Sequence, residues 1–230
     1  LKNLLKNLMA QELLLLTEIL RQEFLKEILS LFDDILIFLI NMQNIFEKTN
    51  KAVIKIGSSL LIKDSAIKVE WLKSLLEDVR LLLDNDIEVV IATSGSVALG
   101  RVSFGQGELS IAQKQAASAI GQINLMAYFQ DIALNEGFGV AQILLSASDF
   151  DDRERYDNLS NVFKELNSKK IVPIINENDS VTVDEIKIGD NDRLAAKVAQ
   201  ICDSDLLVLL SDIDGLYDKN PHLHEDARFI

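Results

Sequence analysis

Downstream of residue 50, short apolar runs rich in β-branched residues alternate with longer stretches in which apolar side chains recur at helical spacing. The short runs predict buried strands at residues 52–56, 88–92, 140–145, 171–175 and 206–210. Strands that alternate with helices build a parallel sheet covered by helices, because parallel neighbours need a crossover connection. The alternation therefore predicts an α/β fold and excludes an all-helical or all-antiparallel one.

Helices are predicted between these strands wherever apolar residues return every three or four positions. The predicted ranges are 71–82, 113–135, 153–168 and 191–202. Residues 181–188 alternate apolar and polar side chains instead, which is typical of one arm of a hairpin.

The first 50 residues have a different character, and we expect them to form a helical N-terminal extension ahead of a domain at 51–230. Leucines and isoleucines recur there at helical spacing, but Lys, Glu and Asp interrupt them. The longest uncharged stretch, residues 35–46, is 12 residues long, whereas a membrane-spanning helix needs about 20. Two origins stay open: residues 1–41 belong to an over-extended reading frame that should start at Met42, or they form a real appendage used in oligomer contacts.

Composition excludes several classes of function. The net charge of −13 argues against nucleic acid as a partner, because phosphate backbones attract clustered Lys and Arg. The single cysteine, Cys202, permits no internal disulfide and is expected to pack in the core. His222 and His224 lie among turn residues, where a metal site is not expected. A cytoplasmic enzyme without a membrane segment is the expectation.

Polar side chains gather directly after four of the predicted strands. The clusters are Gly57-Ser58-Ser59, Thr93-Ser94-Gly95, Asn176 to Asp179, and Ser211-Asp212. In open parallel sheets ligands bind at the edge formed by the carboxyl ends of the strands. Four polar clusters at one edge therefore predict one large binding site.

Several of the polar segments also have a purely structural interpretation. Lys55 followed by Gly57 offers a cation and backbone N–H groups to a phosphate, without the glycine spacing of a Walker A loop, but a strand-to-turn lysine is equally compatible. Ser94 or Ser96 could cap a helix. The glycine turn 189–192 could be a helix cap. Four consecutive amide or carboxylate side chains at 176–179 exceed what a turn needs.

The sequences of these segments resemble those of the amino-acid kinase superfamily, and within it those of the glutamate 5-kinases. The resemblance covers about residues 51–230, and its most specific part is the run Asn176-Glu177-Asn178-Asp179 followed by Gly189-Asp190-Asn191-Asp192. Further matching segments are IKIGSS, VIATSG, SAIGQ, DDRERY, VPIINENDSV, IKIGDNDRLAA and LLSDIDGLYDKNP. The resemblance implies a three-layer α/β/α sandwich around a mainly parallel sheet.

The same resemblance implies roles for individual residues. Lys55 would stabilise the transferring phosphoryl group, and Asp192 would orient the reacting groups. The residues implied in ATP binding are Lys55, Gly57, Ser58, Ser211 and Asp212. Those implied in L-glutamate binding are Ser94, Gly95, Asp179 and Asn191. ATP with Mg²⁺ would be the cofactors, the protein would be a homo-oligomer, and proline would be a feedback inhibitor.

Family members continue with a glycine-rich segment that carries a second catalytic lysine, and the 230 residues contain no such segment. A chain cut there is expected to bind ATP poorly, so binding of glutamate without phosphoryl transfer is one alternative function. The other alternative is a different kinase of the superfamily, acting on N-acetylglutamate, aspartate or a nucleoside monophosphate.

Overall fold

The computed structural model describes residues 48–105, 107–181, 191–213, 215, 217–219, 221, 223–224 and 226–230. Several predictions fall outside these residues: nearly all of the N-terminal extension, the hairpin arm beyond residue 181, the turn at 189–190, and His222. Among the described residues no helix is long and apolar enough to cross a membrane.

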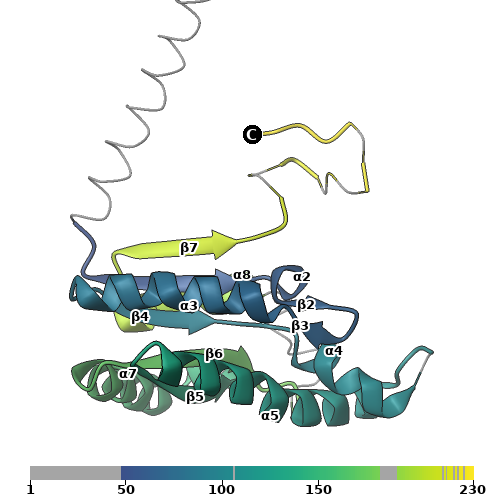
Figure 1. Cartoon of the computed structure of the whole chain (residues 1–230), viewed down its shortest axis with the longest axis horizontal. Coiled ribbons are helices and arrows are strands. Elements are labelled where there is room, and N and C mark those ends of the chain that lie inside the picture. Colours follow the sequence, from purple (N-terminus) through teal and green to yellow (C-terminus); the bar gives the residue numbers. More distant parts are fainter. Residues whose placement is uncertain are drawn as a thin grey trace, which may run out of the picture. The chain divides into compact units, whose positions relative to one another are not determined.

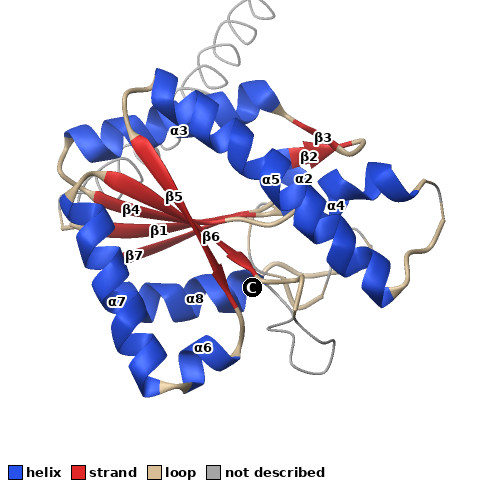
Figure 2. Ribbon diagram, turned by 90° about the horizontal axis from the view of Figure 1, so that it is seen from below, coloured by secondary structure: helices blue, strands red, loops and turns tan. Residues whose placement is uncertain are grey.

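Five strands form one sheet in which every neighbouring pair is parallel. The order across the sheet is β5-β6-β4-β1-β7 (Figure 2). In chain order the strands are β1 (Lys51–Ile56), β4 (Glu88–Ala92), β5 (Gly139–Leu145), β6 (Ile171–Glu177) and β7 (Leu206–Leu210). All five strands predicted from the sequence are present, which confirms the parallel sheet.

Helices lie on both faces of the sheet (Figures 1 and 2). They are α3 (Val69–Asp84) and α5 (Ile111–Asn135) on one face, and α7 (Arg153–Ser168) and α8 (Asn191–Cys202) on the other. The chain moves across the sheet from β1 through β4 to β5, then reverses through β6 to β7. Because crossovers between parallel strands are right-handed, a reversal of direction moves the helices to the opposite face. The three-layer α/β/α sandwich is therefore confirmed.

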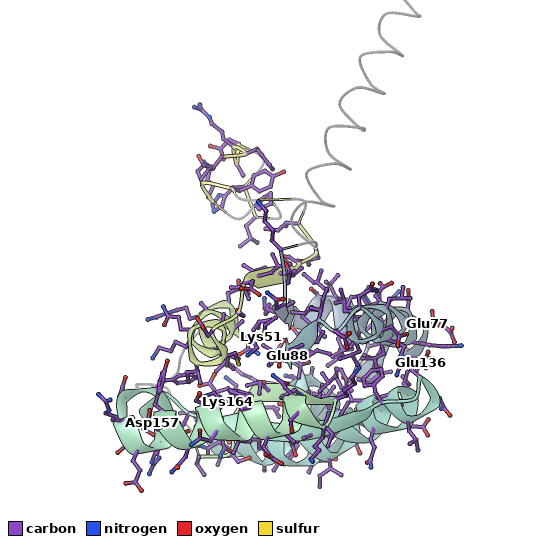
Figure 3. All side chains as sticks on the ribbon, turned by 90° about the vertical axis from the view of Figure 1, so that its left-hand side faces the viewer. Lys51, Glu77, Glu88, Glu136, Asp157 and Lys164 are labelled. Atoms are coloured by element: carbon purple, nitrogen blue, oxygen red, sulfur yellow. The ribbon has the colours of Figure 1, made fainter. Side chains whose placement is uncertain are left out.

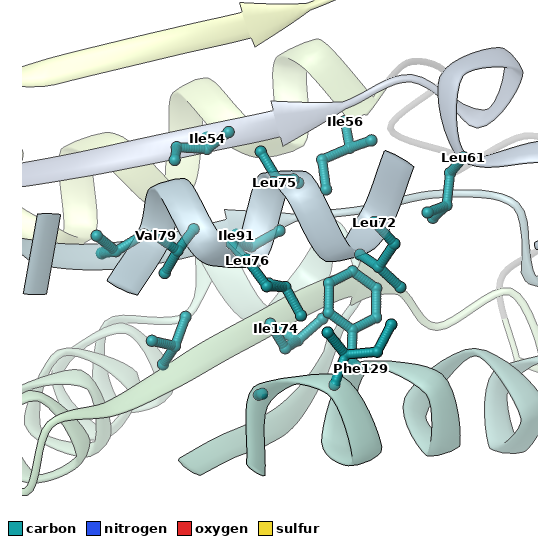
Figure 4. Close-up of a cluster of buried hydrophobic side chains, with 14 of the residues drawn as sticks. Ile54, Ile56, Leu61, Leu72, Leu75, Leu76, Val79, Ile91, Phe129 and Ile174 are labelled. Atoms are coloured by element: carbon teal, nitrogen blue, oxygen red, sulfur yellow. The ribbon is translucent and has the colours of Figure 1, made fainter. Parts of the chain in front are cut away.

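The first core layer lies between the sheet and α3 with α5 (Figure 4). Leu72, Leu76 and Val79 recur on one face of α3 and are fully buried against the strands. Each such side chain contributes about 1.5–3 kcal/mol by leaving water. Phe129 of α5 and Ile174 of β6 join the same cluster, so α5 is held firmly against the sheet.

The second core layer packs α7 and α8 against the opposite face. Phe163 of α7 and Leu194 and Val198 of α8 are almost completely buried there. Cys202 belongs to the same cluster, as expected from its apolar helical surroundings. This packing fixes the start of α8 at the carboxyl edge of the sheet.

At the opposite end of the strands, where they begin, charged side chains connect segments that are far apart in the sequence. Asp205 Oδ2 accepts hydrogen bonds from the backbone N–H groups of Asn50 at 2.7 Å and Lys51 at 3.0 Å. These bonds lower the pKa of the Asp205 carboxyl. Lys51 Nζ also lies 2.9 Å from Glu88 Oε2 (Figure 3). The beginnings of β1, β4 and β7 are thereby tied together.

Several short elements were not predicted from the sequence, because two to five residues carry too little periodicity to be recognised. They are α2 (Ser58–Leu61), the antiparallel pair β2 (Ile62–Lys63) and β3 (Ala66–Ile67), α4 (Ser96–Gly100), the 3₁₀ helix η1 (Arg101–Phe104) and α6 (Ser148–Asp151). Most of them lie in the connections that leave the carboxyl ends of β1, β4 and β5.

Helix α4 crosses α5 at a distance that only glycine permits. A Cβ atom added to Gly121 would lie 1.8 Å from the carbonyl oxygen of Ser96, and one added to Gly100 would lie 1.8 Å from that of Ala117. The Ser96 and Ser118 hydroxyls hydrogen-bond across the same crossing at 2.9 Å. The crossing thus holds the middle of α5 next to the turn that follows β4.

Candidate active site

The carboxyl ends of the strands surround one polar cleft of about 370 Å³. Eight of the residues expected in the site line it: Lys55, Gly57, Ser58, Ser94, Asp179, Asn191, Ser211 and Asp212. Ser59, Val97 and Glu177 line it as well and were not assigned to the site from the sequence. All four polar clusters that follow strands contribute to this cleft, as the parallel topology predicted.

Lys55 is the cation of the cleft wall that β1 provides. Its Nζ lies 2.5 Å from Asp192 Oδ1, and its side chain is only 12% exposed, against 41% for Asp192. Asp192 does not line the cleft itself. It lies in the first turn of α8 and reaches the site only through its ion pair with Lys55.

The turn after β1 departs in one detail from the sequence expectation. The Gly57 N–H donates to the carbonyl oxygen of Leu210 at 3.1 Å, so it extends the pairing of β1 with β7. The backbone donors that remain at this turn are those of Ser58 and Ser59, which open the first turn of α2 and have no preceding helical acceptor. The backbone N–H donors available at this turn are therefore those of the two residues that follow Gly57.

The turn after β4 is shaped by Gly95, which has a φ angle of +105°. This left-handed backbone angle favours glycine, and a Cβ there would also displace the end of the Ile62 side chain, whose Cδ1 would lie 2.2 Å away. Gly95 does not line the cleft, whereas its neighbour Ser94 does and donates its hydroxyl to the Ile56 carbonyl at 3.2 Å. Gly95 thus shapes the turn that presents Ser94.

The end of β6 supplies two of the acidic side chains of the cleft. Glu177 is only 4% exposed, and Asp179 follows in the turn beyond it. The Ser118 hydroxyl of α5 donates to Asp179 Oδ2 at 3.3 Å. Helix α5 therefore supports the acidic side of the site, although sequence analysis assigned it no functional residue.

A chain of side-chain amides runs beneath the cleft from α5 to α8. Asn176 Nδ2 donates to Gln122 Oε1 at 2.8 Å, and Asn176 Oδ1 accepts from the Glu177 N–H at 2.9 Å. Asn191 Nδ2 donates to the Thr93 carbonyl at 2.7 Å and lies 3.5 Å from Asn176 Oδ1. Gln122 belongs to the matching segment SAIGQ but was given no role, because a glutamine in the uncharged middle of a helix has no distinguishing pattern.

The last wall of the cleft follows β7. Ser211 and Asp212 are exposed, and the Ser211 hydroxyl lies 3.4 Å from Asp212 Oδ1. Since β7 pairs in parallel with β1, the residues that follow β7 lie at the same carboxyl edge of the sheet as Lys55. Within the described residues, no group of three or more His, Cys, Asp or Glu side chains is arranged to hold a metal ion.

Sequence comparison finds close relatives of this chain. The glutamate 5-kinase of Nitrobacter winogradskyi is 46% identical over 188 residues, which are 80% of this chain and 50% of that protein. The glutamate 5-kinase of Rhodospirillum rubrum is 46% identical over 182 residues, 77% of this chain and 48% of that protein. The chain spans about half the length of the curated relatives it matches.

Structural comparison supports the fold. An isopentenyl phosphate kinase of T. acidophilum superposes with a TM-score of 0.54 at 22% identity, over 77% of this chain and 76% of that one. The sequence profile of the family described as "Amino acid kinase family" matches residues 50–230. Because this match covers most of the chain, the protein belongs to the amino acid kinase family.

Proposed function

We propose that this chain provides the glutamate site and part of the nucleotide site of a glutamate 5-kinase. Such an enzyme uses ATP to phosphorylate the side-chain carboxylate of L-glutamate, the first step of proline biosynthesis. The observation that carries the proposal is a single cleft in which Lys55 and the acidic and amide side chains beyond β6 meet. The 46% identity to proteins named glutamate 5-kinase supports the choice of substrate.

Phosphorylation of a carboxylate requires cations and hydrogen-bond donors, but it does not require a general base. The side-chain carboxylate of glutamate is already an oxyanion, so it can attack phosphorus without losing a proton. The demand on the protein is to hold two anionic groups in line and to neutralise charge during transfer. Lys55 serves this purpose, and Asp192 keeps its ammonium group in place.

The acidic side of the cleft suits the other end of the substrate. The carboxylate of Asp179 attracts an α-ammonium group, and its position is supported by the Ser118 hydroxyl. Asn191 and Ser94 line the same cleft and add neutral polar groups. We propose that these three lining residues, Asp179, Asn191 and Ser94, bind glutamate.

The nucleotide side of the cleft fits ATP with a divalent metal ion, which we propose to be Mg²⁺. Lys55, the N–H groups of Ser58 and Ser59, and the hydroxyl of Ser211 are donors suited to phosphate oxygens. Mg²⁺ is commonly held by phosphates with one or two carboxylates, and Asp212 offers a carboxylate here. When bound, MgATP supplies the phosphoryl group and additional positive charge.

We also propose that the protein self-associates through the exposed face of α5. No charged residue occurs between Lys114 and Asp131, and Ile123 is 73% exposed on this helix. A large exposed apolar surface is costly unless a partner covers it. Light scattering should report a multiple of 25.7 kDa, and Ile123→Asp should reduce it, whereas the matched change Val162→Asp, at an exposed apolar residue of α7, should not. A monomeric wild-type chain would contradict the proposal.

A substrate panel tests the proposed function. ADP release is measured with L-glutamate, N-acetylglutamate, L-aspartate and UMP, each in the presence and absence of the acceptor. We expect acceptor-dependent ADP release with L-glutamate alone. Preference for another acceptor would assign a different reaction to the cleft, and calorimetric binding of glutamate without ADP release would reduce the function to binding.

A further inference from the structure

The amide chain beneath the cleft has a defined direction, because main-chain groups fix it in two places. Asn176 Oδ1 accepts from the Glu177 N–H, which can only donate. Asn191 Nδ2 donates to the Thr93 carbonyl, which can only accept. Neither asparagine amide can turn over without losing its main-chain bond.

The orientation of the two asparagine amides determines which polar atom, at each end of the amide chain, makes no hydrogen bond within it. Since Asn176 turns its Nδ2 toward α5, Gln122 meets it with Oε1, and Gln122 Nε2 is left buried without a partner among the described residues. Gln122 is only 7% exposed. At the other end, Asn191 uses its Nδ2 beneath the cleft, so its Oδ1 is the polar atom left for a ligand.

The unpartnered nitrogen indicates that Gln122 is more than a packing residue. A buried donor without an acceptor is destabilising, and methionine, of similar length, would fill the same space without that donor. Gln122 does supply one thing that methionine lacks, which is the oxygen that Asn176 Nδ2 needs. Without that oxygen Asn176 Nδ2 would be buried with no acceptor, and only the Glu177 N–H would hold the amide whose Oδ1 lies 3.5 Å from Asn191 Nδ2.

We infer that Gln122 is a positioning residue that keeps the Asn191 amide oriented with Oδ1 toward the ligand. Oδ1 is an acceptor, so it complements a cationic group and repels a carboxylate. Together with Asp179 it would make the cleft select acidic substrates that carry a free α-ammonium group. This inference rests on the proposed function, because it concerns how the same cleft recognises glutamate.

The test compares L-glutamate with glutarate, which lacks only the α-ammonium group. Calorimetry gives the ratio of the two dissociation constants for the wild-type chain, Gln122→Met and Gln122→Glu. Gln122→Met should lower the preference for glutamate by about 10-fold, the effect of one hydrogen bond to a charged group. Gln122→Glu still offers an oxygen to Asn176 and should keep the preference. Asn161→Ala, a change at an exposed position of α7, is the control.

A second readout needs no ligand. Hydrogen exchange of the Asn191 side-chain amide, followed by NMR, should be slow in the wild type and in Gln122→Glu and faster in Gln122→Met. Gln122→Ala provides the same loss of the oxygen if methionine is not accommodated. Unchanged Asn191 exchange, or equal weakening of glutamate and glutarate, would overturn the inference alone. A wild-type chain that binds neither ligand would overturn the proposed function as well.

Discussion

The proposed recognition of glutamate depends most on Asp179. Its carboxylate lines the cleft, and Ser118 donates to it from α5. We expect Asp179→Ala to weaken glutamate binding by roughly 10- to 100-fold, the effect of losing one charged hydrogen bond, and to change ATP binding far less. Calorimetry with each ligand measures both, with Ser180→Ala as the exposed neighbouring control. Equal losses for the two ligands would contradict a role in glutamate recognition.

Cys202 gives a prediction about pH. Burial raises the pKa of its thiol to about 12, although the ammonium of Lys51 opposes the rise. The thiolate is the reactive form, so the native chain should react very slowly with a disulfide reagent at pH 8 and rapidly in denaturant. Because the folded pKa is the higher one, the thiol's contribution to stability is present below about pH 9 and is lost as the pH rises toward 12. Fast labelling of the native thiol would contradict this account.

At the scale of single residues, the sequence predicted the groups that follow strands and missed those supplied by a helix crossing. Asp179 was placed at the carboxyl edge because a strand end fixes where the next side chains lie, whereas the roles of Lys55 and Asp179 came from the resemblance to the glutamate 5-kinases. Gln122 and Ser118 reach the site only because α5 packs against α4 and β6. The hydrogen bond of the Gly57 N–H to Leu210 could not be predicted either, since Leu210 of β7 is more than 150 residues away in the chain.

Among the structural elements, the crossing of α4 and α5 is the most sensitive to substitution. An added methyl group at Gly121 would favour the helix by about 1 kcal/mol, but it would meet the Ser96 backbone at 1.8 Å. Separating the two helices costs more than the gain, so Gly121→Ala should lower the free energy of unfolding by about 1–3 kcal/mol. Urea unfolding measures the change, and Asn124→Ala on the exposed side of α5 should shift stability by less than about 0.5 kcal/mol. A stabilised Gly121→Ala would refute the close crossing.

Long elements were predicted well from the sequence, and short ones were not. The helix predicted at 153–168 is α7, and the strand predicted at 88–92 is β4. Both have enough residues for their apolar spacing to be recognised. Gly95 and Gly100 allow the close approaches of α4, and the β2–β3 pair turns through Asp64 and Ser65, both at positive φ. Neither feature leaves a periodic pattern in the sequence.

For the molecule as a whole, the order of the strands explains why one cleft collects all four polar clusters. The chain starts in the middle of the sheet at β1, runs to one edge at β5 and returns to place β7 on the other side of β1. Right-handed crossovers then bring the ends of β1, β4, β6 and β7 to the same edge. The alternation of strands and helices predicted the sheet, but it did not contain the strand order, which is determined by tertiary packing.

The central claim, that this cleft transfers a phosphoryl group to glutamate with Lys55 as the stabilising cation, is tested most directly by γ-glutamyl hydroxamate formation. We expect ATP-dependent hydroxamate from the wild-type chain and from Lys63→Ala, whose lysine is exposed and away from the cleft. Lys55→Ala should lower the rate by about 10²- to 10³-fold, the usual effect of removing one group that stabilises transition-state charge. Equal rates in Lys55→Ala and the wild type, or no ATP-dependent product from the wild type, would contradict the account.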